Sequence, residues 1–386
     1  MNQKLIKILS YVVVALLSCA LTLTGVFFFI RDDGQTKLEQ LEKLIDSCFI
    51  EDADLEAIED AAAEAMVDAL GDRWSYYMPA GDFESYTEQM KNSYVGIGIT
   101  VQLNEEGLGI DVVQVTAGGP AEAAGVLYGD VVIAVDGKSL EGLTLTEIKA
   151  LIRGEEGSTV GLTICRGEEK LETDVVRTRI NTPVATAQML EGNIGLVTIV
   201  NFDSRCASET VAAIEELLEQ GAEKLIFDVR YNPGGYKKEL VKLLDYLLPK
   251  GLLFRSEYYD GTVEDDMSDA ECLEIPMAVL VNGSSYSAAE FFAAALHDYD
   301  WAVTVGTQTC GKGYFQNTFR LDDGSAVCLS VGKYYTPSEV SLIGVGLTPD
   351  VVVEVDDETA AAIYAGILDP MEDPQILAAI KALNAE

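Results

Sequence analysis

The segment "VLVNGSSYSAAEFF", residues 279–292, predicts the fold class of the largest part of the chain. It begins with an apolar run typical of a buried β-strand, passes through a turn of small residues, and continues with the pattern of a helix. The same order recurs in "KLIFDVR", "NPGG" and "YKKELVKLLDYLLP", between residues 224 and 249. Repetition of this unit indicates an α/β fold with a mostly parallel sheet, which we expect over residues 181–356.

The rest of the folded chain divides into three segments of different pattern. Residues 32–92 carry apolar positions at helical spacing, as in "LEAIEDAAAEAMVDAL", and predict a helical region. Residues 93–180 combine short strands, the glycine loop of "YVGIGI" and one helix starting at Thr144, which predicts a compact β-rich module. Residues 357–386 predict further helical segments.

An uncharged, mostly apolar run occupies residues 8–30 at the N-terminus. As a helix it would reach about 35 Å, enough to cross the hydrocarbon core of a bilayer. Lysines precede the run and acidic residues follow it, which favours an N-terminus on the inner side. We therefore expect residues 1–31 to form a cytoplasmic tip and a single-pass anchor in the cell membrane, with the folded part on the extracytoplasmic side. A cleaved signal peptide and lipoprotein processing at Cys19 are the alternatives.

Composition excludes several classes of function. The chain has 64 acidic and 26 basic residues and a formal net charge of -38, so nucleic acid is not an expected partner. Its seven cysteines show no paired metal-binding spacing, and we expect mostly buried free thiols, no metal and no cofactor. The single histidine, His297, cannot build a zinc site of two or three histidines. It follows Ser287 late on the same predicted helix, so we expect a surface residue rather than a catalytic base.

Ser287 is the candidate nucleophile. It stands where the predicted strand turns into the helix, and the N–H of Ala288 would be free there to point at an oxyanion. The alternative is that a serine of this turn only caps the helix. A second strand-to-helix turn, "NPGG", offers another backbone N–H from Gly234 or Gly235, unless it is an ordinary turn.

Lys312 is the candidate base. In "CGKGYFQ", residues 310–316, it stands between two glycines, so that it can approach a packed wall where burial makes the amine neutral. Gln316 can then orient the amine through a hydrogen bond. The alternative is a lysine in an exposed β-turn.

The ordered motifs "DVRYNPGG", "VNGSSYSAAE", "GTQTCGKGYFQ", "LDDGSAVCLSVGKYYTPS" and "GVGLTPDVVV" resemble those of the carboxyl-terminal processing peptidases, also called tail-specific proteases. "YVGIGI" resembles the start of their PDZ domain, and the resemblance covers residues 37–355. It implies a Ser-Lys endopeptidase with a PDZ domain at 93–180 and a ClpP/crotonase-like core at 181–356. It assigns the nucleophile to Ser287, the base to Lys312 and its partner to Gln316. It also implies that the enzyme recognises the C-terminal tails of exported or membrane proteins.

The resemblance extends to two binding features. The oxyanion donors would be Ala288 and a glycine of "NPGG", for which Gly234 is the best match. The loop that holds a substrate carboxylate would be formed by Gly96, Ile97, Gly98 and Ile99. From the residues themselves, Ile148 and Ile152 of the helix that starts at Thr144 either wall an apolar pocket or belong to the module's own core.

Two positions depart from the family pattern. Family members usually have phenylalanine at the position of Cys310 and alanine at that of Tyr286, which puts the shape of the site beside the nucleophile in doubt. The alternatives to a peptidase are a catalytically inactive PDZ-type binding protein on a protease fold, and an acyl-transfer enzyme. The sequence leaves open the physiological substrate and the oligomeric state, including a homo-oligomer.

Overall fold

The computed structural model describes residues 36–385 apart from Met90, Lys91, Glu105, Ala117 and Glu168, together with the isolated positions 13, 16 and 18. The chain divides into two compact units, residues 1–69 and residues 70–386. In the first unit the structure describes two helices, α2 (Lys37–Cys48) and α3 (Leu55–Asp68). Thr36 and Glu39 form a capping box at the start of α2, and the Asp54 carboxylate accepts a hydrogen bond from the N–H of Ala57 at the start of α3.

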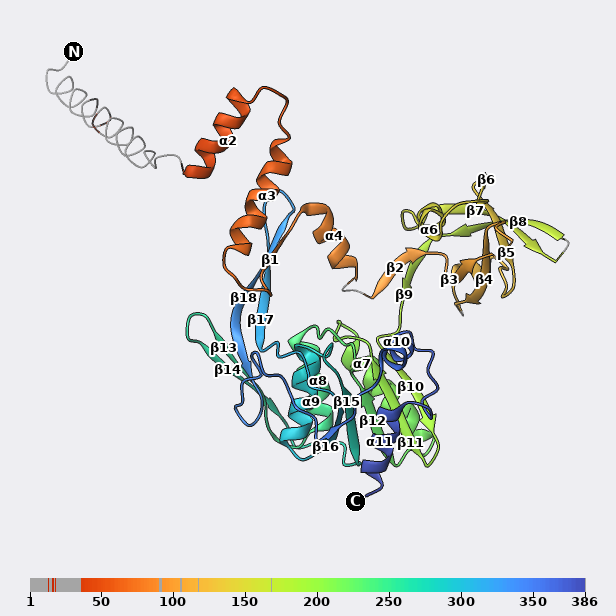
Figure 1. Cartoon of the computed structure of the whole chain (residues 1–386), viewed down its shortest axis with the longest axis vertical. Coiled ribbons are helices and arrows are strands. Elements are labelled where there is room, and N and C mark those ends of the chain that lie inside the picture. Colours follow the sequence, from red (N-terminus) through yellow and green to blue (C-terminus); the bar gives the residue numbers. More distant parts are fainter. Residues whose placement is uncertain are drawn as a thin grey trace, which may run out of the picture. The chain divides into compact units, whose positions relative to one another are not determined.

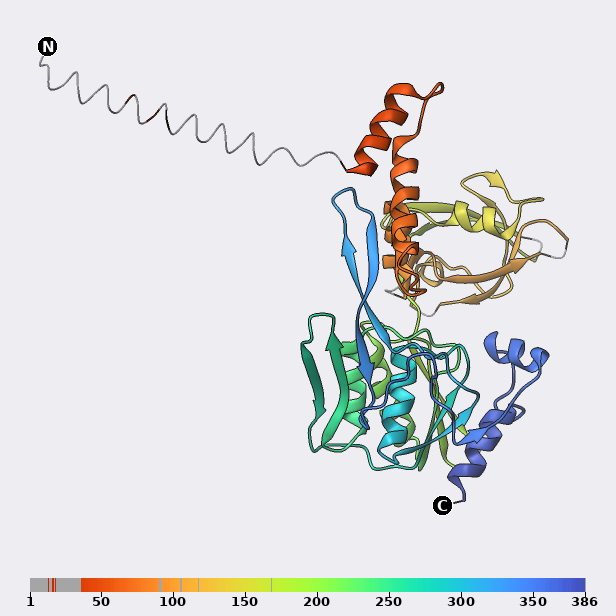
Figure 2. The same ribbon diagram turned by 60° about the vertical axis from the view of Figure 1, so that its left-hand side comes forward.

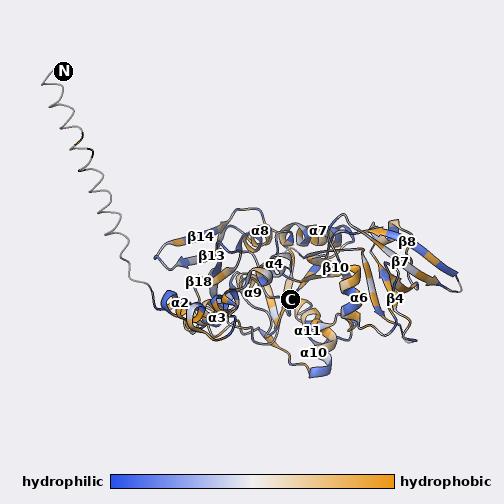
Figure 3. Cartoon of the chain, turned by 90° about the horizontal axis from the view of Figure 1, so that it is seen from above, coloured by the Kyte–Doolittle hydropathy of each residue, from blue (hydrophilic) through white to orange (hydrophobic). Residues whose placement is uncertain are grey.

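The structure corrects one part of the predicted fold class, the N-terminal transmembrane helix. No helix in the described part of the chain is long and apolar enough to cross a membrane. The α2 and α3 helices have 12 and 14 residues and would span about 18 and 21 Å, less than the hydrocarbon core of a bilayer. Figure 3 shows hydrophilic residues along α2. The segment 8–30 lies outside the described residues except for Val13, Leu16 and Ser18, and the predicted helix is not part of the fold class supported here.

The β-rich module at the start of the second unit is built mainly from one antiparallel sheet (Figure 1). The glycine loop joins β2 (Ser93–Gly96) to β3 (Ile99–Leu103), and α6 (Leu145–Ile152) begins at a capping box of Thr144 and Glu147. Ile148 and Ile152 are both buried in the module's core. The other elements are β4 (Ile110–Val115), α5 (Pro120–Ala123), β5 (Val131–Val135), β6 (Lys138–Ser139), β7 (Thr159–Arg166), β8 (Glu169–Val176) and β9 (Thr178–Asn181).

The predicted α/β core is confirmed. Its sheet has the strand order β10-β11-β12-β15-β16-β19, and every neighbouring pair is parallel except β10 and β11. The strands are β10 (Ala185–Leu190), β11 (Ile194–Ile199), β12 (Lys224–Asp228), β15 (Met277–Val281), β16 (Ala302–Gly306) and β19 (Val351–Val352). The helices are α7 (Cys206–Glu219), α8 (Lys237–Leu247), α9 (Ala288–Asp298), α10 (Asp357–Tyr364) and α11 (Pro374–Leu383).

Both faces of this sheet are covered, which explains why its strands read as continuous apolar runs. In β12, Leu225 and Phe227 point into the cluster formed with α7, α8 and α9, whereas Ile226 points into a separate cluster that includes Ile376 of α11. Figure 2 shows α11 on the side of the sheet opposite α8 and α9. The predicted domain boundaries 1–31, 32–92, 93–180, 181–356 and 357–386 stay a prediction.

A second, antiparallel sheet accompanies the core. It consists of β1 (Tyr76–Met78), β18 (Ala326–Tyr335), β13 (Gly251–Tyr258) and β14 (Val263–Ser268), and β17 (Tyr314–Arg320) forms a hairpin with β18. The α4 helix (Ala80–Gln89) follows β1. This sheet is important for the site because β17 follows the loop that carries Lys312 and because β1 follows a turn containing Trp74.

Candidate active site

Ser287 occupies the turn between β15 and α9, where it is the N-cap residue of the helix. Its backbone has φ 58° and ψ -127°, a conformation that non-glycine residues rarely adopt. The side chain is half-buried, and the following Ala288 begins the helix. Among the described residues, the N–H of Ala288 forms no hydrogen bond, as the first turn of a helix allows. The turn thus presents a hydroxyl and an unpaired N–H side by side.

The lysine loop, residues 309–313, requires both of its glycines. A Cβ at Gly311, where φ is +83°, would lie 3.0 Å from the backbone nitrogen of Val345. A Cβ at Gly313 would lie 2.6 Å from Cγ1 of Ile343. The two glycines therefore let the loop pack directly against residues 343–346, and Lys312 is held half-buried.

Burial lowers the pKa of the Lys312 amine below its usual value. Nearby thiols and acidic groups raise the pKa electrostatically, but the effect of burial is larger. These groups are Cys328, Cys310, Asp72 and Glu290. A lysine with a lowered pKa is neutral in a larger fraction of molecules at a given pH, and only the neutral amine can accept a proton.

The amine of Lys312 lies against aromatic rings. Its Nζ is 4.6 Å from the ring centroid of Trp74 and 5.6 Å from that of Tyr286. The two ring centroids are 6.0 Å apart, and the guanidinium of Arg73 lies over the Trp74 ring with its Cζ 4.2 Å from the centroid. Such contacts stabilise a protonated amine. Tyr286, the departure from the family pattern, is therefore a neighbour of the candidate base as well as of the candidate nucleophile.

Gln316 lies in β17 and does not orient the lysine in this conformation. Its side-chain amide donates to the backbone oxygen of Tyr314 at 3.2 Å and to Oγ of Ser330 at 3.1 Å. Within the described residues no hydrogen bond joins Lys312 Nζ to Gln316 or to Ser287 Oγ. Catalytic hydrogen bonds are often formed only when substrate is bound.

The NPGG turn lies directly against Ser287. A Cβ at Gly234 would be 2.8 Å from both the backbone nitrogen of Ala288 and Cβ of Ser287, so only glycine fits there. However, the N–H of Gly234 donates to Oδ1 of the buried Asn232 at 2.8 Å, which leaves it unavailable to an oxyanion in this conformation. The N–H of Gly235 forms no hydrogen bond with described residues, which makes Gly235 the better candidate of the two.

Glu290 is a residue of the site that sequence reasoning missed. Its side chain is fully buried, and Oε2 accepts hydrogen bonds from the N–H groups of Ser287 at 3.1 Å and Lys312 at 2.8 Å. Oε1 accepts from the Gly311 N–H at 2.7 Å and from Oγ1 of Thr309 at 2.6 Å. One carboxylate therefore ties the serine turn to the lysine loop. The detectable signal was an acidic residue inside the otherwise apolar helix "AAEFFAAALHD".

Most of the predicted site residues meet in one pocket of about 640 Å³. Ser287, Lys312, Gln316, Gly234 and Tyr286 all line it. His297 is not among the lining residues, and its Nε2 lies 3.2 Å from Oδ1 of Asp350. His297 was predicted to be a surface residue of the helix rather than the catalytic base; its side chain is partly exposed, late on α9 and away from Ser287.

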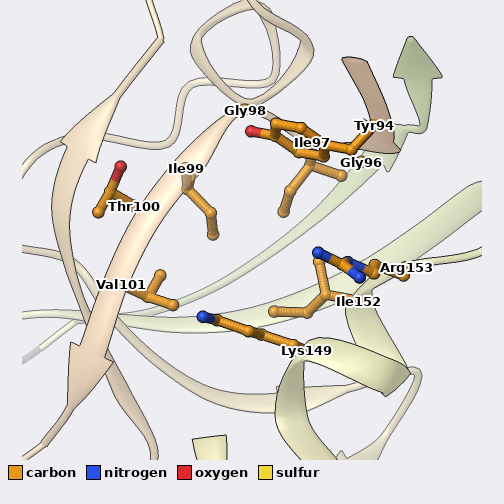
Figure 4. Close-up of a pocket in the computed structure, with 10 residues that line it drawn as sticks. All are labelled: Tyr94, Gly96, Ile97, Gly98, Ile99, Thr100, Val101, Lys149, Ile152 and Arg153. Carbon is orange, nitrogen blue, oxygen red and sulfur yellow. The ribbon is translucent and has the colours of Figure 1, made fainter. Parts of the chain in front are cut away.

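The predicted carboxylate loop lines a different pocket, of about 260 Å³, in the β-rich module (Figure 4). Gly96, Ile97, Gly98 and Ile99 all contribute to it, and Gly98 has φ +76°. Ile152 also lines this pocket, whereas Ile148 belongs only to the core. Ile148 therefore belongs to the core alone, whereas Ile152 belongs to the core and also lines the pocket.

Comparison with known proteins identifies the protein family to which the chain belongs. The sequence profile of peptidase family S41 matches residues 193–353, and that of the PDZ domain matches residues 95–176. The carboxy-terminal processing protease CtpA of Bacillus subtilis (strain 168) is 34% identical over 330 residues, which are 84% of this chain and 70% of that protein. A probable CtpA-like serine protease of Staphylococcus saprophyticus is 32% identical over 83% of this chain and 66% of that protein. The chain thus spans about two thirds of the length of these relatives.

One solved structure supports the architecture. A putative S41 protease from Bacteroides fragilis NCTC 9343 superposes with a TM-score of 0.53 at 19% identity, over 83% of this chain and 90% of that one, which supports the fold alone. The photosystem II D1 C-terminal processing protease is 27% identical over 83% of this chain and 88% of its own, with a TM-score of 0.49. On the identity to CtpA, the chain belongs to peptidase family S41, among the serine-type carboxy-terminal processing proteases.

Proposed function

We propose that this protein is an endopeptidase in which Ser287 and Lys312 act as nucleophile and base on protein substrates held by their C-terminal tails. The observation that carries the proposal is that the two side chains line one pocket, in which burial lowers the pKa of the Lys312 amine. Gln316 lines the same pocket and can orient the amine once substrate is bound.

The reaction proceeds in two balanced stages. The neutral Lys312 amine takes the proton of Ser287 Oγ as that oxygen attacks the carbonyl carbon of the peptide bond. The negative charge that develops on the carbonyl oxygen is stabilised by the N–H of Ala288, with Gly235 as the candidate second donor. The Lys312 ammonium then protonates the leaving amine. Water, deprotonated by the same lysine, hydrolyses the acyl-enzyme and restores the Ser287 hydroxyl.

The pocket of the PDZ domain supports recognition of a free C-terminus. Successive backbone N–H groups at Gly96 and Gly98 can bind a carboxylate, and β3 can accept a peptide as an added strand. Ile97, Ile99 and Ile152 line the pocket beside that loop and favour an apolar last residue. Capture of a tail raises its local concentration at the peptidase without requiring a sequence rule at the cut.

A serine-reactive fluorophosphonate probe tests the dyad. We expect the probe to label Ser287 in the unmutated chain, to label Lys312→Ala much more slowly, and to leave Ser287→Ala unlabelled. Unmutated protein that cleaves a tailed substrate but does not label at Ser287 would contradict the assignment. Mass spectrometry of substrates cut by the unmutated chain, with Ser287→Ala as the control, locates the cleavage sites.

A second candidate is an inactive PDZ-type binding protein, and one observation favours it. The Lys312 amine lies over the Trp74 ring and forms no hydrogen bond to Ser287 within the described residues. If neither labelling nor cleavage depends on Lys312 while the PDZ domain still binds C-terminal peptides, the binding function replaces the peptidase. The extracytoplasmic location of the catalytic part stays a prediction.

A further inference from the structure

Two cationic side chains lie on the wall of the PDZ pocket. Lys149 of α6 and Arg153, the C-cap residue of that helix, are both exposed and both line the pocket. Neither side chain forms an ion pair or a hydrogen bond among the residues that the structure describes. In a chain with 64 acidic and 26 basic residues, two unpaired cations beside one groove indicate a ligand of negative charge.

The positions of the two cations follow the direction of the groove. In Figure 4 the amine of Lys149 lies beside Val101, whereas Arg153 lies beside Ile152, toward the end where the glycine loop starts. Ile99 and Val101 are two residues apart in β3, so their side chains share one face of the strand. A peptide bound with its carboxylate at the glycine loop would therefore run from Arg153 past Lys149.

The spacing of the cations matches that of alternate peptide residues. Lys149 and Arg153 are four residues apart, which corresponds to about 6 Å along a helix. Two residues of an extended peptide span about 6.6 Å, and their side chains point to the same side. When the terminal carboxylate lies at the Arg153 end, the side chain at the third position from the end reaches Lys149.

We propose that the groove selects substrate tails with a carboxylate side chain, aspartate or glutamate, at the third position from the C-terminus, together with an apolar last residue. Lys149 is the specificity-determining residue, and Arg153 adds positive charge at the end that holds the terminal carboxylate. The inference rests on the proposed recognition of free C-termini and adds the class of tail that is preferred.

Peptide binding to the full chain carrying Ser287→Ala tests the inference without cleavage. Fluorescein-labelled ten-residue peptides ending in Glu-Ala-Val, Gln-Ala-Val or Lys-Ala-Val are compared by fluorescence polarisation, with the amidated Glu-Ala-Val peptide as a fourth probe. We expect the glutamate peptide to bind about two- to fivefold more tightly than the glutamine peptide, as for an exposed ion pair. The difference should shrink in 1 M salt, where the screening length is about 3 Å.

Charge reversal then assigns the preference to one residue. Lys149→Glu should make the lysine peptide bind more tightly than the glutamate peptide. Lys170→Glu makes the same charge change on an exposed residue of β8 outside the pocket, and it should leave the preference for glutamate intact. Moving the glutamate to the fourth position from the end, where the side chain points away from α6, should abolish the preference.

The outcomes separate this inference from the proposed function. Equal affinity for glutamate and glutamine, with amidation still weakening binding, would overturn the inference and leave recognition of C-termini standing. Equal affinity for free and amidated peptides would overturn the recognition of C-termini itself. An equal preference for glutamate at the third and fourth positions, or its loss in Lys170→Glu, would show bulk attraction and refute the role of Lys149.

Discussion

Replacing Glu290 by glutamine tests whether one buried carboxylate fixes the serine turn and the lysine loop relative to each other. The carboxylate accepts four hydrogen bonds through its two oxygens, whereas the amide of glutamine has only one oxygen that can accept them. In the less costly orientation the new NH₂ group donates to Oγ1 of Thr309, and the N–H of Gly311 is left without a partner. An unsatisfied buried donor costs about 1–3 kcal/mol, and replacing charge-assisted bonds to Ser287 and Lys312 by neutral ones costs about 1 kcal/mol more. We therefore expect a loss of about 2–4 kcal/mol.

The assay measures kcat/KM on a tailed protein substrate together with the rate of fluorophosphonate labelling. Because the lost bonds fix the turn and the loop relative to each other, about half of this free energy should appear at the transition state. At 1.36 kcal/mol per tenfold, kcat should fall by about 5- to 30-fold, with little change in KM. Labelling of Ser287 should slow to a similar extent.

Glu239→Gln is the matched control. Glu239 is a second buried glutamate, 4% exposed, on α8, where it accepts from the N–H of Ala207 at 3.2 Å and from Lys242 at 2.6 Å. Its replacement should lower the urea midpoint of unfolding without lowering kcat per folded molecule. A Glu290→Gln enzyme within twofold of the unmutated rate, or a Glu239→Gln enzyme that loses as much, would refute the reasoning.

Three further outcomes follow from the state of the Lys312 amine. The kcat/KM value should rise with pH and level off above the lowered pKa of Lys312, because deprotonation creates the base; a rate that falls from pH 6 upward would contradict this. Lys312→Arg should be inactive in the same peptide assay, since arginine stays protonated, and an active variant would exclude the lysine as base. Trp74→Leu removes a contact that stabilises the ammonium, worth about 0.5–2 kcal/mol, while keeping the site apolar. The midpoint of its pH profile should therefore lie about 0.4–1.5 pH units lower, and an upward shift would show that burial by Trp74 dominates.

The sequence predicted those parts of the molecule whose determinants are local. The apolar runs of β12 and β15, and the turns of small residues after them, predicted the parallel sheet because each strand–turn–helix unit carries its own signal. The same signals placed Ser287 and Gly234 at the ends of strands that pair side by side. The glycines around Lys312 predicted close packing, and the structure accounts for both of them.

What the sequence did not predict depends on contacts between distant segments. The ring of Trp74 contacts Lys312, and no local pattern in the sequence connects these two residues. The hydrogen bond from the Gly234 N–H to Asn232 is local, but two donors were available in the NPGG turn and the sequence did not distinguish them. Glu290 was visible as an acid in an apolar helix, whereas three of its four hydrogen-bond donors lie on the loop after β16.

The backbone conformation of Ser287 lowers the folding stability of the chain. A side chain in its left-handed conformation costs about 1–3 kcal/mol. Glycine adopts the same angles without that cost and loses only about 0.5–1 kcal/mol through the greater freedom of the unfolded chain. Removing the hydroxyl by Ser287→Gly should thus yield a chain that folds at least as stably as the active one, by on the order of 1 kcal/mol. Stability alone would favour glycine at this position, so the proposed nucleophile lowers the folding stability of the turn that carries it.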